Sequence, residues 1–162
     1  MNVKDKFKEM VMQMYQLKPI AAYLLGRATD TISTYLNVKK YSPECELNVL
    51  VRKLFYELGV ESSITGWFAL SVLYIPVFYT SSKMLEKLTH KLVRKNVEIW
   101  KELYYAHLYG FSAGSFYASI NNLLFYLNLP HISAEHVQIF SAMITALPFC
   151  FYGRKIYKKL KS

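Results

Sequence analysis

Six polar residues in the first third of the chain have the types and spacing that could do chemistry. They are Arg27, Asp30, Ser33, Thr34, Glu46 and Asn48. Arg27 and Asp30 are three residues apart, so they can form an ion pair on one face of a helix. Ionisable side chains at membrane depth serve ion, proton or solute pathways, which makes this cluster a candidate functional site. The alternative is a structural ion pair that holds the first helix against its neighbours.

A second set of residues is suited to helix packing rather than chemistry. Small and amide side chains recur within one uncharged segment, at Gly110, Gly114, Ala118, Asn121 and Asn122. Small residues let membrane helices approach closely, and buried amides need hydrogen-bond partners on a neighbouring helix. The stripe therefore predicts close packing, either within this chain or against a second chain.

Metal and cofactor motifs are absent from the sequence. The H-E-x-x-H, P-loop and G-x-G-x-x-G motifs do not occur. His131 and His136 are five residues apart, which does not suit a metal pair on one helix face. His107 could donate a hydrogen bond or, as the lesser alternative, ligate haem. We therefore expect no metal and no cofactor, and we favour a non-catalytic protein over an enzyme.

The elements that must position these residues are strongly apolar. Three stretches lack Asp, Glu, Lys and Arg: residues 103–134, 62–82 and 137–153, with lengths of 32, 21 and 17. A helix needs about 20 mostly apolar residues to cross a bilayer. A soluble domain of 162 residues has too small a core to bury three such segments. We therefore expect lipid around these helices.

Composition and charge agree with a membrane location. Hydrophobic residues make up 53% of the chain and charged residues 19%, and the formal net charge is +9. In a soluble protein this charge would suggest binding to nucleic acid, which the long uncharged stretches argue against. In a membrane protein it indicates cytoplasmic loops that contact anionic lipid headgroups.

The predicted fold class is all-α: a polytopic membrane protein with about four transmembrane helices and two amphipathic interfacial helices, in one domain over residues 1–162. Hydrophobic periodicity and turn residues define the segments. The expected spans cover residues 19–38, 62–82, 103–128 and 134–153. The remaining segments are an interfacial helix over 1–17, an amphipathic or re-entrant helix over 44–59, and a basic tail over 154–162.

The distribution of basic residues predicts the orientation of these spans. Four spans place the N-terminal segment, the loop near residues 83–101 and the tail on one side of the membrane. That side holds 15 Lys and Arg residues, and the opposite side holds four. Lys and Arg accumulate in cytoplasmic loops, so both termini are expected in the cytoplasm. Cys45 and Cys150 then lie on opposite sides, and we expect no disulfide between them.

The motif D-T-I-S-T at residues 30–34, followed by E-L-N at residues 46–48, resembles a signature of small prokaryotic multi-pass membrane proteins of unknown function. The resemblance covers roughly residues 24–79, and Val49 stands where that family tends to have proline. It implies that Asp30, Thr34, Glu46 and Asn48 converge near the outer face of a prokaryotic plasma membrane. It implies no particular activity.

The sequence supports more than one function. The favoured hypothesis is a structural or accessory subunit that packs against other transmembrane subunits or against a second copy of itself. The alternatives are a small transporter or channel component, using Arg27, Asp30, Asn121 and Asn122 along a polar path, or an intramembrane enzyme acting on lipid through Asp30, Glu46 and His107.

Overall fold

The computed structural model describes residues 17–46 and 48–161, together with residues 5, 7, 9, 11 and 12. This part of the chain is all-α. Its elements are α2 (Leu17–Lys40), the short 3-10 helix η1 (Pro43–Cys45), α3 (Val49–Leu58), α4 (Val60–Val93), α5 (Trp100–Tyr126) and α6 (Ala134–Lys161). The interfacial helix predicted over residues 1–17 lies, apart from six positions, outside the described residues.

The helices end where the sequence supplies a stop signal. Asn48 caps α3, because its Oδ1 accepts the backbone N–H groups of Leu50 at 3.1 Å and Val51 at 3.4 Å. Gly59 then turns the chain from α3 into α4 with a φ of 79°, a conformation that glycine adopts without strain. Arg94 ends α4 in the left-handed conformation. These turns allow successive helices to fold back on one another.

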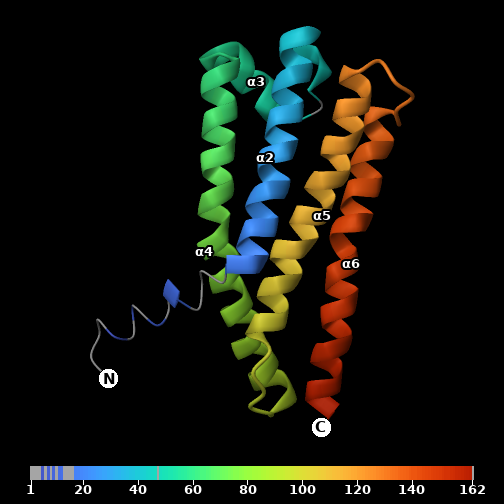
Figure 1. Ribbon diagram of the computed structural model, residues 1–162. Coiled ribbons are helices and arrows are strands. Elements are labelled where there is room, and N and C mark those ends of the chain that lie inside the picture. Colours follow the sequence, from blue (N-terminus) through green and yellow to red (C-terminus); the bar gives the residue numbers. More distant parts are fainter. Residues whose placement is uncertain are drawn as a thin grey trace.

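The four long helices lie side by side and alternate in direction (Figure 1). Helix α2 packs between α4 and α5, and α6 packs mainly along α5. The short helix α3 lies against the start of α4 and against η1. The start of α6 and the end of α5 therefore lie at the same end of the bundle as η1 and α3 (Figure 1).

An aromatic core fills the centre of the bundle. Tyr23, Tyr79, Trp100 and Tyr104 are almost fully buried and pack with Ile75. The Tyr23 hydroxyl donates a hydrogen bond to the backbone oxygen of Ser71 at 2.9 Å, so its polar end is satisfied. A smaller core of Val38, Val51 and Phe55 attaches α3 to the end of α2 and the start of α4. The two cores fix the positions of α2, α3 and α4.

Helix α5 approaches α6 through the glycines of the predicted packing stripe. A Cβ atom on Gly110 would lie 2.5 Å from the backbone oxygen of Thr145, closer than real atoms approach. A Cβ atom on Gly114 would meet the Thr145 side chain and the Ser141 backbone. The Ser141 hydroxyl also donates to the Gly114 oxygen at 3.0 Å. Both glycines thus face a helix of the same chain.

Within the part of the chain that the structure describes, two helices are long and apolar enough to cross a membrane: α4 and residues 135–161 of α6. The sequence predicted four such helices, and α2 and α5 do not meet the same criterion. Helix α5 lacks charges after Glu102, but serine, tyrosine and asparagine side chains make it less apolar. Helix α2 carries Arg27 and Asp30 in its middle. Absence of charge and high hydropathy are therefore different properties in this chain.

The observed helices differ in length from the predicted segments. Helix α4 continues through the basic residues after position 82 and ends at Val93. Helix α6 continues to Lys161, so the predicted basic tail over 154–162 is helical where it is described. In place of the single helix predicted over 44–59, the structure has two separate helices, η1 and α3. Lysine and arginine are good helix formers, which explains the extension of both long helices.

The glycine packing gives a direct test of the α5–α6 contact. The substitution Gly110→Ala should lower the free energy of unfolding by about 1–3 kcal/mol, because overpacking forces the backbone of α6 away. Gly66→Ala is the matched control, since a Cβ atom there meets nothing within 4 Å. Thermal unfolding in detergent measures both variants, and equal midpoints for the two would contradict this packing.

Candidate functional site

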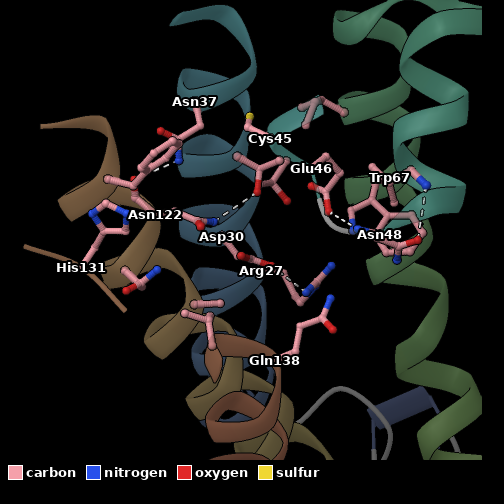
Figure 2. A pocket seen from close by; sticks show the side chains of 18 of the residues that line it. Arg27, Asp30, Asn37, Cys45, Glu46, Asn48, Trp67, Asn122, His131 and Gln138 are labelled. Carbon is pink, nitrogen blue, oxygen red and sulfur yellow. Dashed lines mark hydrogen bonds and ion pairs between the residues drawn. The ribbon is translucent and has the colours of Figure 1, made fainter. Parts of the chain in front are cut away.

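A cavity of about 450 Å³ lies at the end of the bundle that carries η1 and α3. Figure 2 shows polar side chains from α2, α5 and the segment before α3 projecting into one region. Most of the residues singled out from the sequence line the cavity: Arg27, Asp30, Thr34, Glu46, Asn48, Ala118, Asn121 and Asn122. Segments far apart in the chain therefore bring their polar residues together, including the four that the family resemblance predicted to converge.

Arg27 and Asp30 form the inner part of the site. The Arg27 Nη1 lies 3.1 Å from Asp30 Oδ2 and also donates to Ser115 Oγ at 3.0 Å, while Nε donates to Ser71 Oγ at 3.1 Å. The exposed fractions of the two charged side chains are 16% and 21%. Arg27 thus ties α2 to α4 and α5, and its charge is balanced by a carboxylate.

This pair lies deep in the bundle. Arg27 is 13 residues before the end of α2 at Lys40, a distance of about 20 Å at 1.5 Å per residue. The lining extends from Arg27 up to Glu44, Glu46 and Asn48, which precede α3. The cavity therefore connects one end of the bundle with its middle.

Amide side chains hold the wall formed by α2 and α5. Asn37 Nδ2 donates to the backbone oxygen of Asn122 at 2.9 Å, and Asn122 Nδ2 lies 3.4 Å from both Ser33 Oγ and Thr34 Oγ1. Ser33 itself does not line the cavity, and its hydroxyl donates to the Asp30 backbone oxygen at 3.0 Å. These bonds fix the relative depth of α2 and α5, so the cavity lining is held in place.

Asn121 holds the connection between α5 and α6. Its Oδ1 accepts the Ile132 N–H at 2.8 Å, and its Nδ2 donates to the Ile132 oxygen at 3.1 Å. This reciprocal pair keeps the segment around His131 over the cavity, where His131 and Ile132 belong to the lining. An amide near the end of α5 therefore holds the loop between α5 and α6 in place.

Two carboxylates lie at the outer part of the site. Glu46 Oε1 accepts the Asn48 N–H at 2.7 Å. The hydroxyls of Ser42 and Tyr56 donate to the Glu44 carboxylate and lower its pKa to about 2. Glu44 is therefore ionised at any physiological pH. Cys45 lies between them, and burial raises the pKa of its thiol, so it is a poor nucleophile.

Sequence reasoning missed several lining residues. Trp67 lines the cavity and packs against the small core around Val51 and Phe55. Asn37 and Gln138 also line the cavity, and neither belongs to a sequence motif. Asn37 lies three residues after Thr34, on the same helix face. This spacing is the feature of the sequence from which its place in the lining could have been predicted.

Two further features that could suggest an enzyme have structural roles. Sequence analysis did not single out residues 110–114, which match the G-x-S-x-G pattern of serine hydrolases; that pattern places its serine on a strand-to-helix turn. Here the pattern lies inside α5, and the Ser112 hydroxyl is buried and donates to the Ala22 oxygen at 2.6 Å. His107 is bonded through Nδ1 to the Leu103 oxygen at 2.7 Å. Among the described residues, no group of three or more His, Cys, Asp or Glu side chains could hold a metal ion.

No protein-family model, curated protein or solved structure matches the chain. The function is therefore inferred from the site itself.

The Arg27–Asp30 pair gives a prediction about coupling. Replacing one partner, as Arg27→Met or Asp30→Leu, leaves the other charge unpaired and should lower the free energy of unfolding by about 3 kcal/mol. The double variant should lose less than the sum of the two single losses, because both charges are removed together.

A denaturation series in detergent measures this cycle. The control is the exposed pair Lys53–Glu57, whose charged atoms lie 3.6 Å apart. The corresponding substitutions are Lys53→Met and Glu57→Leu. The coupling of this control pair should be below about 1 kcal/mol, as for other surface ion pairs. Strict additivity at Arg27 and Asp30 would show that the two charges do not interact.

Proposed function

We propose that this chain is a non-catalytic, four-span membrane protein that holds a small polar solute in the cavity above Arg27 and Asp30. The proposal has two parts, a membrane location for all four long helices and a binding role for the cavity. The cavity is the observation that carries the binding role.

The membrane part rests on the way α2 and α5 pack. Both lie beside helices that are apolar enough to cross a bilayer: α2 along α4, and α5 along α6 (Figure 1). Helix α2 has 24 residues and α5 has 27, so each reaches about 36 to 40 Å at 1.5 Å per residue. A helix packed lengthwise against a spanning helix shares its environment. Buried polar groups of α2 and α5 face one another, as in other membrane bundles.

Charge at the two ends of the bundle supports an orientation with both termini in the cytoplasm. The connection between α4 and α5 and the end of α6 lie at one end (Figure 1). The basic residues of that end are Lys83, Lys87, Lys91, Arg94, Lys95, Lys101, Arg154, Lys155, Lys158, Lys159 and Lys161. The positive-inside rule places this end in the cytoplasm, against anionic headgroups. The cavity then opens toward the outer side.

The binding part rests on the volume and depth of the cavity. A volume of about 450 Å³ falls within the range of sites for small molecules, about 300–1,000 Å³. Its ionisable residues reach the middle of the bundle, the depth at which transporters hold their solutes. The lining groups are fixed by bonds from α4 and α5 to Arg27 and from α2 to α5. A preformed polar cavity within an apolar bundle is what a solute-binding or transport component requires.

A packing subunit is the second candidate function, and α6 favours it. This helix packs mainly on α5 and leaves a row of large apolar side chains exposed: Ile139, Phe140, Met143, Leu147 and Phe151. Lipid or another transmembrane helix would cover such a face equally well. Gly110 and Gly114 do not add to this candidate, because they already face α6. The native mass of the protein in detergent distinguishes a lone chain from a subunit.

Filling the cavity tests the binding role. Ala118 lines the cavity, and Ala118→Phe should occupy part of its volume and prevent a solute from entering. Small neutral, cationic and anionic solutes at millimolar concentration are added to the protein in detergent, and its unfolding midpoint is recorded. At least one class of solute should raise the unfolding midpoint of the unchanged protein and should not change the unfolding midpoint of Ala118→Phe.

Ala69→Phe is the matched control, because Ala69 is exposed on α4 and does not line the cavity. It should respond to the solutes as the unchanged protein does. A panel with no effect on any variant, or with the same effect on Ala118→Phe, would contradict solute binding in the cavity.

A further inference from the structure

We propose that the solute bound in this cavity is a small organic cation with N–H donors, such as a primary ammonium or an alkylguanidinium ion. This inference rests on the proposed function and names the chemical class of its solute. Three properties of the lining support it: its net charge, its unpartnered oxygen atoms and its aromatic side chains.

The charge of the lining is negative. Its ionisable side chains are Arg27, three carboxylates, His131 and Cys45. Asp30 lies 3.1 Å from Arg27 and cancels its charge. Glu44 and Glu46 lie at the outer part of the cavity, and hydroxyl groups hold the pKa of Glu44 near 2. Arg52 attracts the Glu44 carboxylate but does not line the cavity. An anion entering the cavity would meet these two carboxylates before it reached Arg27, so the charge favours a cation.

Two buried oxygen atoms on the lining residues have no hydrogen-bond partner. They are Oδ1 of Asn37 and Oγ1 of Thr31. These two residues are 4% and 7% exposed, and both line the cavity. A buried polar atom without a partner lowers the stability of the fold, and a ligand that bonds to it removes that loss. Asn37 Oδ1 can only accept a hydrogen bond, so a ligand that satisfies it must carry a donor.

Aromatic rings complete the lining. Trp67 and Phe125 belong to it, from α4 and α5 respectively. A cation near an aromatic ring face is attracted by the negative charge density of that face. A bare metal ion fits less well, because the described residues hold no group of three metal-ligating side chains and the cavity is far larger than one ion. An ammonium or guanidinium ion can interact with the carboxylates, the unpartnered oxygen atoms and the aromatic rings of the lining at the same time.

The test compares probes of similar size and different charge. Ethylammonium, tetramethylammonium, acetamide and acetate are added at equal ionic strength to the full chain in detergent, and affinities are taken from the unfolding midpoint. Ethylammonium should bind best. Tetramethylammonium should bind more weakly, because it has no N–H donor for Asn37. Acetate should not bind.

Charge removal supplies the second arm of the test. Glu46→Gln keeps an oxygen that accepts the Asn48 N–H and removes the charge, and it should weaken ethylammonium binding about tenfold without changing the affinity for acetamide. Glu44→Gln should act in the same direction if Glu46→Gln does not fold. Glu57→Gln is the control, because Glu57 is exposed on α3 and does not line the cavity.

The outcomes separate this inference from the proposed function. Suppose that acetamide or acetate binds with the affinity of ethylammonium, and that Ala118→Phe abolishes this binding. This result would contradict a preference for cations but would still support solute binding in the cavity. Equal ethylammonium affinity in Glu46→Gln, Glu44→Gln and the unchanged protein would overturn the preference for cations too. Binding of no probe by any variant would overturn both proposals.

Discussion

The partly buried Arg27 sets the central constraint on this fold. A guanidinium group inside an apolar bundle must have its charge and its N–H donors satisfied by protein groups, because an unpaired charge removed from water is costly. Asp30 balances the charge, and Ser71 and Ser115 accept further hydrogen bonds from α4 and α5. One side chain therefore joins three helices. The cavity lies directly beside this junction, so the interaction that holds the bundle together also shapes its polar interior.

The outer end of the bundle is built to keep that interior open. Asn121 clamps the segment between α5 and α6, and the small core of Val38, Val51 and Phe55 holds α3 on the opposite side. Each structure covers part of the cavity without filling it. The glycines of α5 are used elsewhere, in its close contact with α6. Close packing against α6 and lining of the cavity thus fall at different heights along α5, with the glycines nearer its middle and Ala118, Asn121 and Asn122 nearer its end.

The sequence predicted the helical architecture well because hydrophobic periodicity and turn residues are local signals. It also predicted the Arg27–Asp30 pair from their spacing. It did not predict that α6 continues through the basic tail to Lys161, because lysine and arginine are good helix formers and resemble a loop when charge alone is counted. Trp67, Asn37 and Gln138 were missed as cavity residues because the cavity is made by contacts between distant segments. The sequence predicted a spanning helix over residues 103–128, and it did not predict that the serine and asparagine side chains of α5 face the interior of the bundle.

Labelling from the outside of intact cells tests the membrane account most directly. Cys45 and Cys150 are replaced by serine, and single cysteines are introduced as Lys53→Cys on α3 or Arg94→Cys after α4, both at exposed positions. A membrane-impermeant maleimide should modify Lys53→Cys in intact cells, whereas Arg94→Cys should react only after the cells are opened. Reaction of both cysteines, or of neither, before the cells are opened would contradict a bundle that crosses the membrane with its cavity facing outward.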